Sequence, residues 1–362
     1  MNRKHREPLI HLSKRKELAW QKEWGIRLLA IVIALIVCAV VTVIVTGIDP
    51  IGFYKTMVAG AFGTARRRWT LGKETAVLLC ISLALTPAFR MRFWNLGGEG
   101  QILIGALATT ACMILLGNKL PAPLLILIMV LAALAAGAVW AMLPALCKAK
   151  WNTNETLFTL MMNYVATQLC AYFIIVWEVP KGSGKIGIIN QSTEAGWLPI
   201  IGNRYLLTIL VVAILTIAMY IYLTYSKQGF EISVVGESEA TARYVGIKVS
   251  KVIIRTLLIS GAICGLTGFL LVSGTDHTLT TTLAGGKGFT AVMVAWLAKF
   301  NPLGMVLSSL LLVFLSQGSA EITSIYGLNQ SFGDILTGII LFFIIGSEFF
   351  INYRLHFRKA AK

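Results

Sequence analysis

The chain has 362 residues, of which 57% are hydrophobic and 13% are charged, and its formal net charge is +16. Soluble globular domains are roughly half apolar and about one quarter charged, so this chain has too few charged residues to cover an ordinary water-facing surface. The basic residues do not alternate with aromatic residues in any compact polar segment, which argues against nucleic-acid binding. The composition therefore predicts a protein of the lipid bilayer.

Long apolar runs predict an all-α, polytopic membrane bundle of about ten transmembrane helices. A hydrocarbon core about 30 Å thick needs about 20 helical residues to cross, and a helix pairs its own backbone groups in lipid. We divide the chain into a basic N-terminal segment 1–27, a transmembrane domain 28–350 and a tail 351–362. The predicted spans are 28–48, 75–89, 101–117, 121–146, 156–177, 205–225, 252–273, 286–299, 302–320 and 332–350.

The distribution of the 32 Lys and Arg residues predicts that both termini are cytoplasmic. In that orientation most of the basic residues fall on the inner side, including those of segment 1–27 and of loop 226–251, as the positive-inside rule requires. Arg66, Arg67 and Arg68 fall on the outer side instead. We therefore expect segment 51–65 to lie along the membrane interface or to re-enter the bilayer.

Two predicted spans are short, and each borders a glycine-rich break. The sequence GGEG at 97–100 follows span 75–89 and faces the cytoplasm in this topology, whereas GGKG at 285–288 opens span 286–299 and faces outward. Broken helices at matching positions in two halves are typical of a transporter built from inverted repeats, here relating spans two to five with spans seven to ten. The alternative is that both breaks are ordinary turns between helices.

The sequence lacks the motifs of an enzyme. It contains no GxxxxGK[ST] loop, no HExxH and no GxSxG, and the lysine of GGKG is not followed by Ser or Thr. We therefore expect no catalytic residue, no metal and no cofactor in this chain, and we expect that the chain cannot hydrolyse ATP itself. Because the acids lie at the predicted helix ends, we expect a membrane core nearly free of titratable groups, which argues against an ion-driven carrier.

Polar residues within the apolar region are candidates for a solute path, because they normally face protein or water. Glu99 begins a predicted span, where it either contacts solute or complements the helix dipole. Asn163 lies deeper, where it either lines the path or forms a hydrogen bond between helices. Gln317 lies near the outer end of span 302–320. Trp94 and Phe289 adjoin the breaks and either stack on a solute or anchor the chain at the membrane interface.

Loop 226–251 contains a short predicted helix at 237–245. Ser238 is a suitable N-cap, and Gly246 occupies the position after the helix where a left-handed residue is common. A helix of about two turns is marginal alone in water, so we expect it to dock on another surface. That surface is either a cytoplasmic partner or the bundle of this chain itself.

Four motifs, in order along the chain, resemble one family. The segments FWNLGGEGQ (93–101), NET (154–156) with MNY (162–164), ARYVGI (242–247) and NPLG (301–304) resemble those of permeases in binding-protein-dependent importers for simple sugars and nucleosides, and are most similar to the nucleoside branch. The resemblance implies a fold like that of the vitamin B12 permease, a type II importer, in a prokaryotic cytoplasmic membrane. It adds Asn95 to the candidates for the solute path.

The resemblance also implies partners and a coupling surface. The partners would be a separate ATP-binding cassette ATPase, which would bind ATP with its magnesium, a second homologous permease subunit and an extracytoplasmic solute-binding lipoprotein. The solute would be a nucleoside, with a simple sugar such as ribose or galactose as the alternative, and an ion-driven secondary transporter as the alternative mechanism. The residues expected to couple to the ATPase lie in loop 226–251 and are Glu237, Glu239, Ala242, Arg243, Tyr244 and Gly246.

Overall fold

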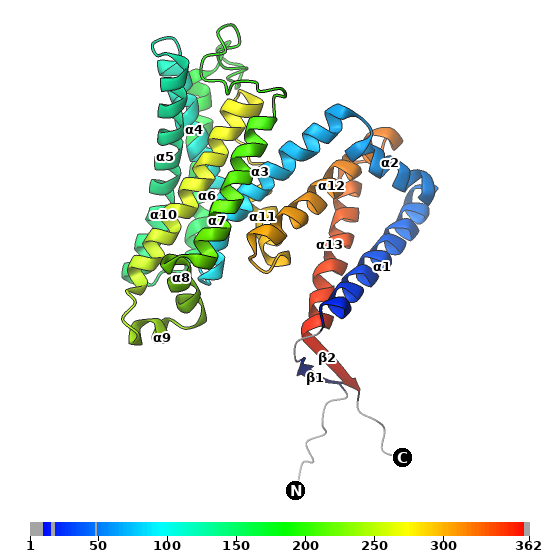
Figure 1. Cartoon of the computed structure of the whole chain (residues 1–362). Coiled ribbons are helices and arrows are strands. Elements are labelled where there is room, and N and C mark those ends of the chain that lie inside the picture. The colour runs from blue at the N-terminus through cyan, green and yellow to red at the C-terminus, as the bar shows by residue number, and fades with distance from the viewer. Residues whose placement is uncertain (1–9, 16–18, 48, 358–362) are drawn as a thin grey trace, which may run out of the picture. The chain divides into compact units, whose positions relative to one another are not determined.

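The computed structural model describes residues 10–15, 19–47 and 49–357, so the predicted segments 1–27 and 351–362 lie partly outside the described residues. The regular elements of the described part are helices apart from two short strands, β1 (Ile10–Lys14) and β2 (Tyr353–Phe357) (Figure 1). The helices are α1 (Trp20–Thr46), α2 (Pro50–Phe62), α3 (Ala65–Arg90), α4 (Gly98–Leu116), α5 (Ala122–Trp151), α6 (Glu155–Trp177), α7 (Leu206–Tyr225), α8 (Lys227–Glu237), α9 (Glu239–Tyr244), α10 (Val249–Leu271), η1 (Val272–Asp276), α11 (Lys287–Leu297), α12 (Pro302–Tyr326) and α13 (Gln330–Asn352).

Nine helices of the described part are long and apolar enough to cross a membrane, which confirms the all-α polytopic bundle. The expected span 286–299 differs, because α11 has only 11 residues and is therefore about 16 Å long, half of a bilayer core. The backbone stops the helix at both ends. Gly286 before it has φ +75°, and Lys299 after it has φ +51°.

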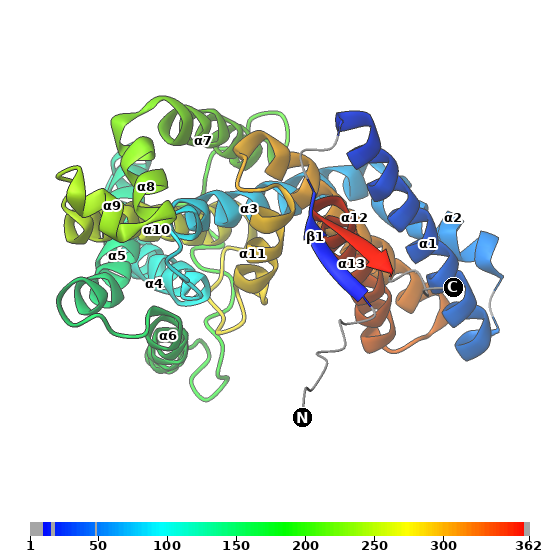
Figure 2. The same cartoon turned by 90° about the horizontal axis from the view of Figure 1, so that it is seen from below.

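Two compact units make up the chain, and each is described by itself. The larger unit comprises residues 68–313. Its most buried helices are α3 and α10 with η1, in which 83% and 78% of the residues of an apolar 18-residue segment are buried. Helix α10 packs closely against α5 and α4. Glycines permit this approach: a Cβ on Gly265 would lie 2.1 Å from the carbonyl oxygen of Ala133, and one on Gly105 would lie 2.4 Å from the Cα of Gly265. Figure 2 shows α10 beside α5 and α4.

The smaller unit comprises residues 1–67 and 314–362. The terminal strands β1 and β2 pair antiparallel, with Ile10 opposite Phe357 and Lys14 opposite Tyr353, so the two ends of the described chain lie together. Most of segment 51–65, which the sequence predicted to lie along the interface or to re-enter the bilayer, forms the separate helix α2. The side chain of its N-cap, Asp49, accepts a hydrogen bond from the Gly52 amide at 2.8 Å.

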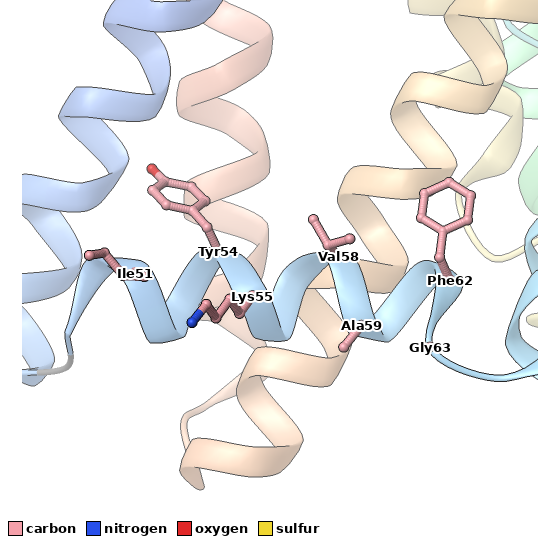
Figure 3. Close-up of a pocket in the computed structure, with 7 residues that line it drawn as sticks. All are labelled: Ile51, Tyr54, Lys55, Val58, Ala59, Phe62 and Gly63. Atoms are coloured by element: carbon pink, nitrogen blue, oxygen red, sulfur yellow. The ribbon is translucent and has the colours of Figure 1, made fainter.

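One face of α2 packs inside the smaller unit and the other is open. Gly60 adjoins α12, since a Cβ there would lie 2.6 Å from the Cβ of Glu321. On the open side Tyr54, Val58 and Phe62 point the same way and line a shallow hollow of about 640 Å³ (Figure 3). The Tyr54 hydroxyl donates to the backbone carbonyl of Leu35 in α1. Helix α2 is therefore fixed to the helices that cross the membrane.

Helix α3 begins ten residues before the predicted span 75–89, at Ala65. The difference arises because residues 65–74 are strongly charged, and a hydropathy window places such a segment outside the membrane. In the structure these charges find partners: Arg67 donates to Glu321 at 2.7 Å within the smaller unit. The three arginines 66–68 are thus part of a helix, and the loop expected on the outer side is much shorter.

Candidate functional site

The candidate site is a helix break inside the larger unit. After α3 ends, residues 91–97 fold back into the bundle, and α4 starts there. Asn95 is fully buried and its Nδ2 donates to the Ser260 hydroxyl at 3.2 Å. Ser260 lies about 16 Å along α10 from its first residue, Val249. The N-terminus of α4 therefore opens within the bundle and not at its surface.

Asn95 also forms hydrogen bonds with other polar groups of the break. Its Oδ1 accepts hydrogen bonds from the Gly97 amide at 3.1 Å and from the Gln101 side chain at 3.2 Å. The first amides of a helix have no partner within the helix, and no bulk water reaches them in a bilayer core. Asn95, a predicted path residue, thus supports the break from inside.

Asn163 of α6 holds the break from the neighbouring helix. Its Oδ1 accepts from the Gly100 amide at 2.8 Å, and its Nδ2 donates to the Leu96 carbonyl at 2.9 Å. A Cβ on Gly100 would lie 2.9 Å from that Oδ1, so glycine is required for the approach. Asn163 therefore forms the interhelical hydrogen bonds that were the alternative expected for it. A contact with solute stays a prediction.

The two glycine-rich breaks meet, although the sequence places them on opposite sides of the membrane. The Glu99 carboxylate in the first turn of α4 accepts a hydrogen bond from the Gly288 amide in the first turn of α11 at 3.1 Å. A Cβ on Gly288 would lie 2.7 Å from Glu99 Cγ, so this contact also depends on glycine. Two helix N-termini therefore meet in one small region of the bundle, where Asn163 and Glu99 accept from the Gly100 and Gly288 amides.

A charged cluster adjoins this region, and it was missed because span 75–89 excluded it. Glu74 of α3 accepts from Lys73 at 2.7 Å and from Lys287 at 2.8 Å, and Lys73 lies 3.9 Å from Asp276. The side chains of Glu74 and Lys287 are 23% and 29% exposed. Charged groups within a bilayer core normally face protein or a water-filled path. Its members come from the charged first part of α3, the start of α11 and the end of η1, so the expectation that the membrane core is nearly free of titratable groups stays a prediction.

Exposed aromatic residues line the same part of the larger unit. The rings of Trp94 and Trp296 lie 5.5 Å apart, and Phe289 of α11 is 44% exposed. The sequence singled out Trp94 and Phe289 but not Trp296, whose signal is its spacing of seven residues from Phe289, two turns along the same face. Gln317, the remaining path candidate, belongs to the smaller unit and so is not grouped with the others.

The predicted helix of loop 226–251 is present as α9. The Ser238 hydroxyl accepts from the Thr241 amide at 3.2 Å, and Gly246 has φ +84°, so both predicted end signals are confirmed. Arg243 donates to Glu239 at 3.3 Å on the exposed face. Glu237 ends the preceding helix α8, a segment that the sequence predicted as loop.

One residue of α9 is fully buried while its neighbours are exposed. Ala242 has 0% exposure and belongs to a core that includes Met91 and Phe93, whereas Tyr244 is 92% exposed. Phe93 directly precedes Trp94 at the break. The short helix α9 therefore presents an open surface and shares a core with the chain segment that forms the break.

The loops between α6 and α7 and between η1 and α11 are ordered by local contacts. The Glu178 carboxylate accepts from the amides of Gly182 and Gly184 at 2.7 and 2.8 Å, and these hydrogen bonds lower its pKa. His277 stacks on Trp197 with ring centroids 3.8 Å apart, and burial lowers the pKa of the imidazole to about 4. These loops thus present a defined surface. Within the described residues no group of three or more His, Cys, Asp or Glu side chains is suited to a metal ion.

Comparison with known proteins finds relatives along most of the chain. The profile of the family described as branched-chain amino acid transport system / permease component matches residues 73–345. The chain is 30% identical over 325 residues to a guanosine ABC transporter permease of Bacillus subtilis, which covers 88% of this chain and 92% of the relative. No solved structure matches the chain.

Two further relatives cover nearly the full length. The chain is 28% identical over 357 residues to a glucose ABC transporter permease of Haloferax volcanii, covering 95% of this chain and 93% of the relative. It is 27% identical over 345 residues to a nucleoside ABC transporter permease of Lactococcus lactis subsp. cremoris, covering 92% and 94%.

Proposed function

This chain belongs to the family of branched-chain amino acid transport system permease components, and we propose that, as the permease subunit of an ABC importer, it forms the path by which a nucleoside enters a prokaryotic cell. The observation that carries the proposal is the meeting of α4 and α11, two helix N-termini inside the membrane bundle joined by Glu99 and Gly288. Broken helices of this kind supply polar backbone groups to a solute within a bilayer.

A nucleoside is favoured over a simple sugar by two considerations. Two of the relatives described above are named as guanosine or nucleoside permeases, and one as a glucose permease. Exposed indole faces beside the break suit a planar base. The remaining path candidates, Asn95 and Asn163, would act by holding the backbone of the break in place.

The nucleoside proposal is tested by a ligand screen on the cognate binding protein. We expect saturable binding of guanosine, with ribose, galactose and glucose binding at least tenfold more weakly, which corresponds to about 1.4 kcal/mol. Tighter binding of a sugar than of any nucleoside would overturn the choice of solute and leave the permease assignment intact.

Energy would enter through α9. We propose that a separate ATPase subunit docks on its exposed face, including Tyr244 and the Arg243–Glu239 pair. Since Ala242 shares a core with Met91 and Phe93, a displacement of α9 would move the segment that leads into the break. Glu237, at the end of α8, and Gly246, which lets the chain turn after α9, would fix the position of the helix.

The complete importer would contain this chain, a second homologous permease, two ATPase subunits and an extracytoplasmic binding lipoprotein. Pairing of β1 with β2 supports the proposal that both ends of the described chain lie on the same side of the membrane, and the positive-inside rule makes that side the cytoplasmic one. Purification of the tagged chain from its natural membrane is expected to retain the ATPase. Retention of the ATPase at the same level by a tagged Tyr244→Ala variant would contradict docking on α9.

A further inference from the structure

Lys287 is the first residue of α11, a position that is unfavourable for a cation. The N-terminus of a helix carries a partial positive charge, which attracts carboxylates and repels ammonium groups. The N-terminus of α4 lies next to it, since the Gly288 amide donates to Glu99 in the first turn of α4. The Lys287 side chain is only 29% exposed, so water screens this repulsion in part. The lysine therefore needs a nearby anion.

That anion is Glu74 of α3. Its Oε2 accepts from the Lys287 ammonium at 2.8 Å, and its Oε1 accepts from the Lys73 ammonium at 2.7 Å. Lys73 in turn lies 3.9 Å from Asp276, at the end of η1. The two lysines thus share one carboxylate, and among the described residues Glu74 is the only salt-bridge partner of Lys287.

Two consecutive residues fix the first turn of α11. The side chain of Lys287 binds α3, and the amide of Gly288 binds α4 through Glu99. The other buried residues of the helix come after this turn and are Ala291, Val294 and Ala295. The chain before the helix does not continue it, because Gly286 is left-handed with φ +75°. The place of the first turn therefore depends on these two polar contacts.

The alternative is an ordinary surface ion pair, and two observations argue against it. Surface pairs join solvent-exposed side chains, whereas Lys73 and Glu74 are only 11% and 23% exposed. Glu74 also directly precedes residues 75–89 of α3, all of which are buried. The pair thus lies at the entrance to a buried helix and keeps a lysine at the unfavourable end of another. Residues that break a local rule in this way are expected at functional sites.

We propose that Glu74 is a positioning residue for transport. Acting through Lys287, it holds the first turn of α11 against Glu99, so that the two helix N-termini stay together at the break. The inference rests on the proposed function and gives a role to a residue outside the predicted span 75–89. Glu74 does not contact the solute in this role. Without the pair, the first turn of α11 would move away from Glu99 and transport would fall.

Hydrogen exchange of the complete transporter in detergent tests the positioning directly. The first amides of a helix have no partner within the helix, so protection of the Gly288 amide depends on Glu99. Loss of one hydrogen bond to a charged group should make exchange in the first turn of α11 about tenfold faster in Glu74→Gln and in Lys287→Met. Lys287→Arg keeps the charge and the donors, so its exchange should stay within about threefold of the wild type.

Glu348→Gln is the matched control. It removes an ion pair of similar burial in the smaller unit, where Glu348 accepts from Arg27 at 2.6 Å and the two side chains are 20% and 21% exposed. Exchange in the first turn of α11 should be unchanged in this variant. A general loss of stability on losing an ion pair is thereby separated from a local effect at the break.

Uptake in proteoliposomes tests the consequence for transport, with this chain, its partner permease, the ATPase and the binding protein. ATP-driven guanosine uptake should fall about tenfold in Glu74→Gln and in Lys287→Met. The double variant should fall no further, because both changes remove the same contact. Lys287→Arg and Glu348→Gln should stay within about threefold of the wild type.

The two measurements decide separate parts of the proposal. Wild-type exchange in both Glu74→Gln and Lys287→Met would overturn it even if uptake falls, since the pair would then not hold the first turn. Faster exchange with normal uptake would overturn the role in transport. Wild-type uptake of glucose but not of guanosine would overturn only the proposed solute. Glucose uptake would then replace guanosine uptake in the same comparison, and the exchange result would stand unchanged.

Discussion

Replacing Asn163 by alanine tests the claim that the break is held open by side chains. The substitution removes the acceptor of the Gly100 amide and the donor to the Leu96 carbonyl, whose hydrogen bonds are 2.8 and 2.9 Å long. Each group left without a partner in a membrane interior costs roughly 1–3 kcal/mol. We therefore expect Asn163→Ala to lower the free energy of unfolding by about 2–6 kcal/mol if no water enters.

The assay is the thermal midpoint of the detergent-solubilised chain, with two comparison variants. Asn163→Asp keeps the acceptor for the Gly100 amide but places a second carboxylate oxygen against the Leu96 carbonyl, so its midpoint should also fall below that of the wild type. Gln168→Ala, on an exposed position of the same helix, should change the midpoint little. Equal midpoints for Asn163→Ala and Gln168→Ala would refute the reasoning, because the two hydrogen bonds would then contribute nothing.

Three further predictions concern packing, coupling and pH. Gly265→Ala should destabilise the protein by about 1–3 kcal/mol in a thermal melt, since its Cβ would lie 2.1 Å from a backbone oxygen, whereas Gly338→Ala, with open space around it, should be neutral or slightly stabilising. Arg243→Glu and Gly246→Pro should abolish uptake without preventing membrane insertion, and normal uptake by both would contradict coupling through α9. Because burial lowers the pKa of His277 to about 4, its neutral form stabilises the loops around it above about pH 6.5, and this stability is lost as the pH falls toward 4. The wild-type melting midpoint should fall more between pH 7 and pH 4.5 than that of His277→Phe. Equal falls of the two midpoints would contradict a stabilising role for neutral His277.

Hydropathy predicted the centres of the membrane helices, because a bilayer selects apolar runs of a fixed length. It failed where charges are paired within the bundle. The charged start of α3 is stabilised by the pairing of Arg67 with Glu321 and of Glu74 with Lys287, contacts that no local window contains. Local cap signals were more reliable: Ser238 and Gly246 marked the ends of α9 correctly.

The centre of the candidate site could be predicted only in part. The glycine-rich breaks were visible in sequence, but the hydrogen bond between Glu99 and Gly288 joins residues 189 positions apart. The predicted topology placed those breaks on opposite sides of the membrane, since it treated each helix as a full crossing of the bilayer. A half-length helix such as α11 brings its N-terminus into the bundle, and that cannot be read from composition.

The most direct test of the account is uptake by the complete importer in sealed proteoliposomes. We predict that guanosine accumulates when ATP is supplied on the ATPase side and the binding protein on the opposite side, and that a proton or sodium gradient alone drives none. Accumulation by this chain without its ATPase, driven by an ion gradient, would contradict the account.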